Sequence, residues 1–298
     1  MEQEELEAFR NAGKIAAKIR EESKGLIMVD ASLLDIAETI EQMIEEEGAK
    51  PAFPVNVSIN EIAAHYTPEI GSEALLGDSD LVKIDLGIDV DGALSDTAYT
   101  IDLGGGNSGL VSASEEALEA AISAIRPGVS VGEIGGVIED AITKHGFRPI
   151  SNLTGHMIKS NALHAGIEIP NVRSNTPYQF KPDDIFAVEP FATDGEGYVE
   201  DMQQVEIFSV FQPGNVRMRQ SRKIIEFVLE NYGMLPFAER WLRKEFKSRL
   251  LVSAAIKELL QHHVLRGYPV LREVKKGMIS QAEHTILITD DGCEVLTR

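Results

Sequence analysis

The stretch KIDLGIDVDGALSDTAYTIDLG, residues 83–104, is the part of the chain that decides the fold. Two runs of β-prone residues flank the dipeptide Asp91-Gly92, which is typical of a two-residue hairpin turn. Each run nevertheless carries an acid, Asp85 or Asp96, where a buried strand would normally hold an apolar or neutral residue. The sequence therefore predicts a β-hairpin that carries two carboxylates in buried-looking positions.

The register of this hairpin brings the two acids close together. With a two-residue turn, Gly87 faces Asp96 and Asp85 faces Ala98, so the two acids are diagonal neighbours on one face of the hairpin. Diagonal neighbours lie about 7–8 Å apart, and two buried carboxylates repel each other unless a cation lies between them. We expect Gly87 to leave room for such a cation. The alternative, which we favour for Asp89 near the turn, is an acid exposed to solvent.

The bulk composition indicates an ordinary globular protein. The chain has 298 residues, 43% hydrophobic and 26% charged, enough for one large domain or two smaller ones. A net charge of −20 disfavours binding to nucleic acid or to an anionic membrane, so neither partner is expected. The single cysteine, Cys293, suits a reducing compartment. No segment has the apolar length of a leader or a membrane span, and we expect a cytoplasmic protein.

Two segments of the chain follow the same pattern. Residues 4–53 and 114–150 each read as a helix, a break containing glycine, a second helix and an extended run, with Ser114 as the expected start of the second segment. A histidine-bearing segment and an acid-bearing strand follow each pair of helices. The pattern indicates an internal duplication. It predicts an α+β fold of two αα-then-β halves, with sheets side by side, helices outside and a site between the halves.

Residues 209–269 break this pattern. They read as three helices that are richer in Lys and Arg than the rest of the chain, followed by an extended run. This order predicts a winged-helix-like insert, with a catalytic domain formed by residues 1–208 and 270–298. In so acidic a protein we expect the insert to shape one wall of a substrate pocket rather than to bind nucleic acid.

Four acids and one histidine occupy apolar or glycine-rich settings and are candidate metal ligands. An oxygen-rich set with one imidazole suits divalent ions such as Mn, Fe, Co and Zn rather than ions that prefer thiolates. Four carboxylates balance the charge of two dications, and such a pair can activate water and polarise a carbonyl group. The candidate ligands are Asp85, Asp96, His156, Glu189 and Glu283, with His65 and His164 as accessory groups.

Five motifs spread along nearly the whole chain resemble those of the methionine aminopeptidases, in the pita-bread metallopeptidase superfamily. In order they are FPVNVSINEIAAHYTP, KIDLG…LSDTAYT, NLTGHMI…LHAG, FAVEPFAT and QAEHTILIT. Together, in this order, they are far more specific than any one of them alone. The insert before Glu283 resembles the type 2 subfamily, and the layout without a long charged N-terminal extension resembles its archaeal members. The resemblance implies the pita-bread fold.

The resemblance also implies an activity and roles for residues. It implies removal of the initiator methionine from nascent proteins whose second residue is small, with two divalent metal ions as cofactor. Asp96 and Glu283 would bridge the two ions, and a bridging hydroxide would attack the scissile carbonyl with Glu189 as proton acceptor. His65 and His164 would bind the substrate and stabilise the amide and the tetrahedral intermediate.

The same resemblance points to a pocket and to partners. Phe53 and Leu163 match positions that line the methionine pocket. Pro236 falls at another wall position, where the family usually has a smaller or different residue, and Glu206 stands where eukaryotic relatives carry a histidine. The implied substrates are N-terminal methionine peptides of nascent proteins, which places the enzyme near the ribosome, and family members are usually monomers.

Two alternative functions remain open on the sequence. A prolidase or an aminopeptidase P resembles the chain in its five ligands, but such enzymes usually carry a sizeable N-terminal domain, and only 84 residues precede Asp85 here. A relative without activity could instead keep the fold and bind RNA or protein, but such relatives typically lose ligands, and all five positions are filled.

Overall fold

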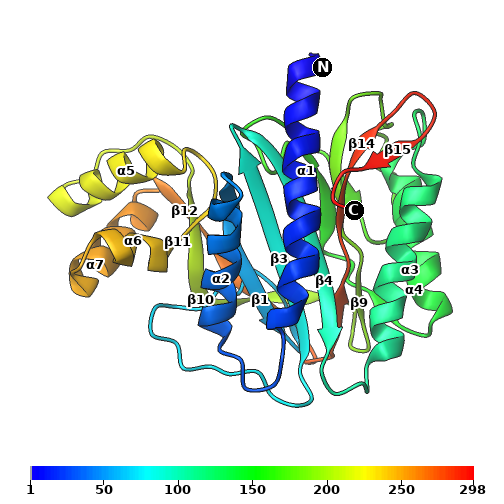
Figure 1. Cartoon of the computed structure of the whole chain (residues 1–298), viewed down its shortest axis with the longest axis horizontal. Helices are drawn as coiled ribbons and strands as arrows, with labels where there is room; N and C mark the ends of the chain where they lie inside the picture. Colours follow the sequence, from blue (N-terminus) through cyan, green and yellow to red (C-terminus); the bar gives the residue numbers. More distant parts are fainter. Residues whose placement is uncertain (1) are drawn as a thin grey trace.

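The computed structural model describes residues 2–298, and its first half contains a pair of helices packed on a three-stranded sheet (Figure 1). Ile19 and Ile40 of the helices pack against Val55 and Ile84 of the strands in one apolar core. The elements are α1 (Gln3–Ser23), a short 3-10 helix (Lys24–Leu26), α2 (Leu33–Glu46), β1 (Lys50–Ile59), β2 (Ile62–Ala64), β3 (Leu81–Val90) and β4 (Ala93–Asp102), with sheet order β1-β3-β4.

The second half repeats this arrangement with a larger sheet. The helices are α3 (Ser108–Ala124) and α4 (Val131–Lys144); α3 begins six residues before the expected Ser114, and Ser130 with Glu133 forms a capping box on α4. The strands are β5 (Arg148–Pro149), β6 (Thr154–Ile158), β7 (Glu168–Pro170), β8 (Ile185–Val188), β9 (Phe191–Thr193), β13 (Ile279–Gln281), β14 (His284–Ile288) and β15 (Cys293–Val295), in the orders β15-β14-β8-β6-β7 and β13-β9-β5.

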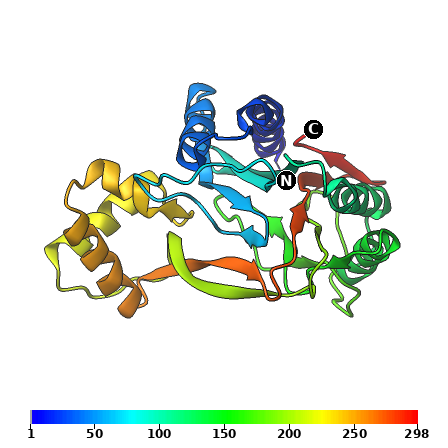
Figure 2. The same cartoon turned by 90° about the horizontal axis from the view of Figure 1, so that it is seen from below.

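Both pairs of helices lie on the outside of the molecule, as predicted, and the strands of the two halves face one another between them (Figure 2). The halves are joined where β4 meets the segment leading into β14, since the Glu283 N–H donates to the Ala98 carbonyl at 3.0 Å. The predicted two-half α+β architecture is therefore confirmed. Within residues 2–298, no helix combines the length and apolarity that crossing a membrane requires.

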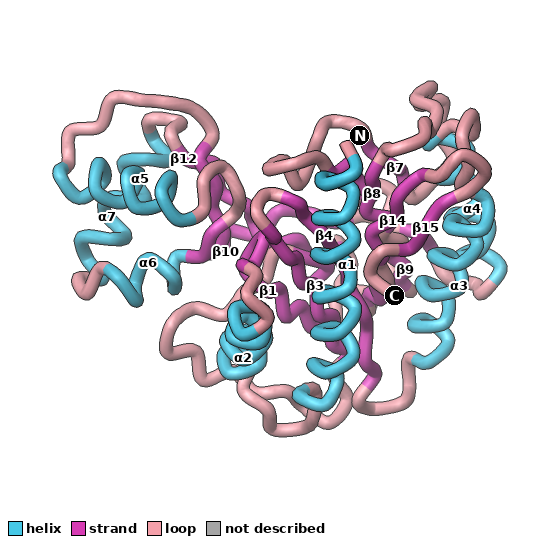
Figure 3. Tube along the Cα trace, turned by 45° about the horizontal axis from the view of Figure 1, so that its top comes forward, coloured by secondary structure: helices cyan, strands magenta, loops and turns pink. Residues whose placement is uncertain are grey.

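Three helices gather at one end of the molecule, within the expected insert (Figure 3). They share a core around Leu242 and Phe237. Two long strands, β10 and β12, pair antiparallel and run from the body into this part, so the expected boundaries at 209 and 269 fall inside strands. The elements are β10 (Val199–Val210), α5 (Arg219–Asn231), β11 (Phe237–Ala238), α6 (Glu239–Glu245), α7 (Arg249–Gln261) and β12 (Leu265–Glu273).

The central hairpin has the register that the sequence predicts. Gly87 pairs with Asp96 and Asp85 with Ala98. The expectation that Gly87 leaves room for a cation is wrong, because a Cβ atom there would lie 2.3 Å from Cε1 of Phe53. The absent side chain makes room for an aromatic ring of β1, and any cation must lie elsewhere on this face.

Candidate metal centre

One cavity of about 210 Å³ is lined by all five predicted metal ligands. The ligands come from both halves of the molecule and meet where the sheets face each other. They are Asp85 of β3, Asp96 of β4, His156 of β6, Glu189 between β8 and β9, and Glu283 between β13 and β14.

Backbone and hydroxyl hydrogen bonds hold the two halves in register at this point. The Thr285 hydroxyl accepts the Asp96 N–H at 2.8 Å and donates to the Asp96 carbonyl at 2.8 Å. The Thr97 hydroxyl donates to the Glu283 carbonyl, also at 2.8 Å. These bonds fix Asp96 and Glu283 relative to each other although they are far apart in sequence.

A half-buried arginine reinforces the same junction. Arg20 of α1 donates to the Thr97 hydroxyl at 3.0 Å and to the Ala98 carbonyl, and its guanidinium lies 5.5 Å from the centre of the Tyr99 ring. Thr285 lies two positions after Glu283, a spacing that puts both side chains on one face of an extended chain. Nothing in the sequence indicated that Arg20 of helix α1 would bond to this junction.

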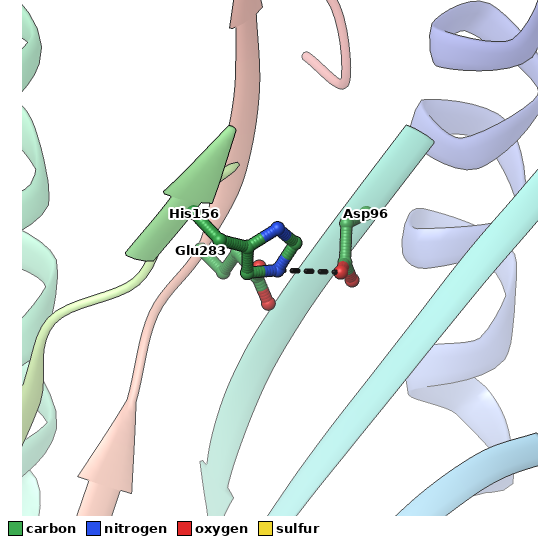
Figure 4. Close-up of side chains that lie close together, drawn as sticks. All are labelled: Asp96, His156 and Glu283. Atoms are coloured by element: carbon green, nitrogen blue, oxygen red, sulfur yellow. Dashed lines mark ion pairs between the residues drawn. The ribbon is translucent and has the colours of Figure 1, made fainter. Parts of the chain in front are cut away.

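Several polar atoms of the ligand cluster have no partner within residues 2–298. The unpartnered atoms are Oδ1 of Asp85, Oδ1 of Asp96, Oε1 of Glu283 and Nδ1 of His156. The other ring nitrogen, Nε2 of His156, lies 3.5 Å from Oδ2 of Asp96 and 3.7 Å from Oε1 of Glu189. Figure 4 shows His156, Asp96 and Glu283 converging from three segments. Ligand atoms of these three residues all lie within 4.8 Å of one another.

The electrostatics of the cluster favour a bound cation. Burial raises the pKa of Asp96 to about 7. Burial first, and then repulsion between neighbouring carboxylates, raises the pKa of Asp85, Glu189 and Glu283 well above the usual range. Burial lowers the pKa of His156 to about 4, which keeps the imidazole neutral and able to bind a metal. Buried carboxylates with free oxygens and no cationic partner are costly, and divalent metal ions fit this donor set.

The two accessory histidines lie on the walls of the same cavity. Nδ1 of His65 is 3.1 Å from the Pro269 carbonyl, and the ring packs edge-on against Tyr268 with 5.6 Å between ring centres. The ring of His164 lies 4.2 Å from that of His156, at a more exposed position. Loss of hydration lowers the pKa of both His65 and His164, so both rings are neutral at pH 7.

The walls of the cavity contain three residues that the resemblance placed in a substrate pocket: Phe53, Leu163 and Pro236. Glu206 is absent from the lining, although Ile207 beside it belongs to the lining. Sequence reasoning missed further lining residues because their types carry no chemical signal in isolation. Among them are Asn56, Ile207 and Tyr268.

Residues 7–290 match the signature of metallopeptidase family M24, and the chain belongs to this family. Within it the chain falls with curated archaeal methionine aminopeptidases. It is 46% identical to the one from Methanocaldococcus jannaschii over 100% of both chains. It is 47% identical to the one from Pyrococcus abyssi, over 98% of this chain and 99% of the relative.

Solved structures show the same pita-bread fold. A methionine aminopeptidase from Thermotoga maritima matches with a TM-score of 0.74 and 22% identity, over 100% of this chain and 98% of that one. A thermophilic Arx1 matches with a TM-score of 0.87 and 20% identity, over 99% and 91%. A prolidase from Pyrococcus furiosus matches with a TM-score of 0.65 and 18% identity, over 100% of this chain and 64% of the prolidase.

Proposed function

We propose that this protein is a metal-dependent aminopeptidase that removes the initiator methionine from polypeptides whose second residue is small. The observation that carries the proposal is the buried cluster of four carboxylates and one imidazole with unpartnered atoms, at the base of a partly apolar cavity. Full-length relatives at 44–47% identity are named methionine aminopeptidases, which favours this substrate over the Xaa-Pro substrates of prolidases.

We propose that the five clustered residues would hold two divalent ions, for which Asp96 and Glu283 would serve as shared ligands. Mn, Fe, Co and Zn all suit this donor set. When bound, such ions act as Lewis acids on a carbonyl group and lower the pKa of water. Metal analysis of the purified protein tests the number and the identity of the ions.

Glu189 is the proposed proton acceptor. Its side chain lies in the cavity, and burial together with the nearby Asp96 and Asp85 raises the pKa of its carboxyl group well above the usual range. A carboxylate of raised pKa can take a proton from the attacking water and later deliver it to the leaving amine. Its Oε1 lies 3.7 Å from Nε2 of His156 within the ligand cluster, which supports this role.

The hydrogen bond of His65 to the Pro269 carbonyl indicates which of its ring nitrogens donates and which accepts. A carbonyl oxygen only accepts, so Nδ1 of His65 must donate to Pro269, and Nε2 is left as an acceptor. In this tautomer Nε2 can accept the N–H of the scissile amide. The neutral ring of His164 can donate to the carbonyl oxygen, where negative charge develops in the transition state.

The proposed methionine pocket is lined by Phe53, Leu163 and Pro236. Phe53 and Leu163 are buried, and together they form an apolar wall. An unbranched thioether side chain fits irregular apolar space of this kind. The free amine of the substrate would then approach the acidic base of the cavity, which explains why only a terminal residue is removed.

The deciding experiment compares Met-Ala-Ser with Xaa-Pro peptides, with and without a chelator. Release of free methionine that stops on chelation and returns with added divalent metal supports the proposal. Cleavage of Xaa-Pro peptides alone would indicate a prolidase. No metal-dependent cleavage of either peptide would indicate a binding protein.

A single variant tests the division of roles between ligands and accessory histidines. His164→Ala is expected to keep its bound metal, because His164 contributes no ligand, and to lose on the order of 10²-fold in kcat. Metal analysis and peptide turnover on one preparation measure both quantities. Loss of metal in His164→Ala would contradict the proposed role.

We further propose that the protein works as a cytoplasmic monomer close to the ribosome, because its substrates are nascent chains. Gel filtration with light scattering measures the oligomeric state. Co-sedimentation of the protein with ribosomes at low and moderate salt tests the association.

A further inference from the structure

Strand β1 is irregular where it borders the cavity. Its pairing with β3 shifts register between Pro51 and Phe53, and again between Phe53 and Asn56. Phe53 and Asn56 both line the cavity, and Asn56 pairs across the sheet with Asp85. Register shifts of this kind re-aim side chains and leave backbone groups without a strand partner. The position of Phe53 and Asn56 therefore depends on what satisfies the backbone between them.

Side chains satisfy the backbone of Val55, which lies in this irregular stretch. The Val55 N–H donates to Oε1 of Glu41 in α2 at 3.2 Å, and the Thr67 hydroxyl donates to the Val55 carbonyl at 2.8 Å. Both polar groups of Val55 are therefore bound by residues from outside the sheet.

Two residues of α6, in the insert, hold these partners in place. Arg240 donates to Oε1 of Glu41 and, at 2.9 Å, to the Thr67 hydroxyl, while Trp241 donates to Oε2 of Glu41 at 2.9 Å. Arg240 is 2% exposed and Glu41 is 6% exposed. The insert thus reaches the edge of the cavity through one connected set of buried hydrogen bonds.

We propose that Arg240, Glu41 and Thr67 form a positioning network through which the insert sets the shape of β1 and so the placement of Phe53 and Asn56 in the substrate pocket. None of the three lines the cavity, so each acts through Val55. The inference deepens the proposed function and rests on it.

The chemistry of the network supports a positioning role. A buried ion pair loses hydration, and apolar contacts would hold the insert to α2 at least as stably. Directional hydrogen bonds to one peptide unit instead fix a backbone geometry that apolar contacts would leave adjustable. The ligand strand β3 is also held along its other edge by β4, so loosening β1 should spare the metal centre.

Thr67→Val is the test variant, because it keeps the side-chain volume and removes the hydroxyl that joins Arg240 to Val55. We expect the KM for Met-Ala-Ser to rise about tenfold while kcat and metal content stay within about twofold of wild type. Thr67→Ser keeps a hydroxyl and is expected to restore most of the loss. This pattern of KM change and rescue would not follow from a general loss of stability.

Glu294→Gln is the matched control. It breaks the bidentate ion pair of Arg10 with Glu294, which joins α1 to β15 away from the cavity lining. Its KM is expected to equal that of wild type. A wild-type KM in Thr67→Val, or an equal rise in Glu294→Gln, would overturn the inference.

Amide exchange separates failure of this inference from failure of the proposed function. If wild type releases no methionine, the proposed function fails. The inference is then decided by amide exchange at Phe53, Val55 and Asn56, which should be faster in Thr67→Val than in wild type and unchanged in Glu294→Gln. Unchanged exchange in Thr67→Val would overturn the inference.

Discussion

Glu41 and two acids of the metal centre, Asp96 and Glu283, are deeply buried, but their surroundings differ. The oxygens of Glu41 accept hydrogen bonds from Arg240, Trp241 and the Val55 N–H. In the metal centre, one oxygen each of Asp85, Asp96 and Glu283 has no partner within residues 2–298. Burial raises the pKa of the acids in both places, but Arg240 bonds the Glu41 carboxylate directly, whereas Arg20 reaches only the backbone carbonyl of Glu283 and is the smallest of the influences on its pKa.

This difference separates structural from functional acids without any reference to relatives. A buried carboxylate whose hydrogen bonds all come from the chain needs no further partner once the protein has folded. Carboxylates that face one another with free oxygens lack a positive partner, and they can acquire it only from outside the chain. Four variants, taken from the largest expected effect to the smallest, test this distinction.

Asp96→Asn should have the largest effect. It replaces a proposed shared ligand by a neutral amide, and we expect loss of most bound metal and a fall in kcat/KM on the order of 10³-fold. Asp89→Asn is the control from the same hairpin, because Asp89 accepts the Gly92 N–H at 2.7 Å and lies outside the cavity lining. Full metal occupancy in Asp96→Asn would refute the ligand assignment.

Arg240→Met should destabilise the protein strongly, because it leaves the Glu41 carboxylate buried without its cation. We expect the free energy of unfolding in urea to fall by about 3–5 kcal/mol. The exposed pair of Arg173 with Asp140 provides a control, and Arg173→Met should leave the unfolding midpoint unchanged. Equal unfolding midpoints for Arg240→Met and wild type would show that Glu41 is not a structural acid of this kind.

Asp85→Asn should stabilise the metal-free protein, whereas Arg240→Met destabilises it. The folded-state pKa of Asp85 is raised, so its contribution to stability is present at low pH and is lost as the pH rises above the unfolded pKa. Removing the charge should therefore stabilise the chelated protein by about 1 kcal/mol at pH 8 and by less at pH 5. Thermal unfolding after chelation measures this, and destabilisation at pH 8 would contradict it.

Glu206 is intermediate between Glu41 and the acids of the metal centre, and Glu206→Gln should have the smallest effect. Burial, with the nearby Glu239 and Glu69, raises its pKa to about 7, and the more distant charge of Arg240 opposes this rise only weakly. Its stabilising contribution is complete below the unfolded pKa and is lost as the pH rises through 7. Allowing for its partial exposure, Glu206→Gln should gain about 0.5–1 kcal/mol at pH 8 and less at pH 5. The same gain at both pH values would show a cause other than charge.

Much of the centre could be predicted because it depends on local rules. The Asp-Gly turn sets the register of the hairpin, and the register alone places Asp85 and Asp96 on one face. The extended segments that carry Glu189 and Glu283 could be predicted from the apolar runs beside them, and each acid lies directly beside a strand end. Ser114 was wrong as a helix start because α3 begins at Ser108, where the turn after Asp102 ends.

The sequence by itself determined the inventory of this protein: the hairpin, the repeated pair of helices, the three helices near the end and the acids that have no place in an apolar strand. These follow from turn chemistry and from residue periodicity, which act over a few positions. Only the tertiary structure decided which groups Arg20, Arg240 and the Phe53 ring contact. Their contacts join residues far apart in the chain, and side-chain packing between separate elements sets them rather than any local pattern.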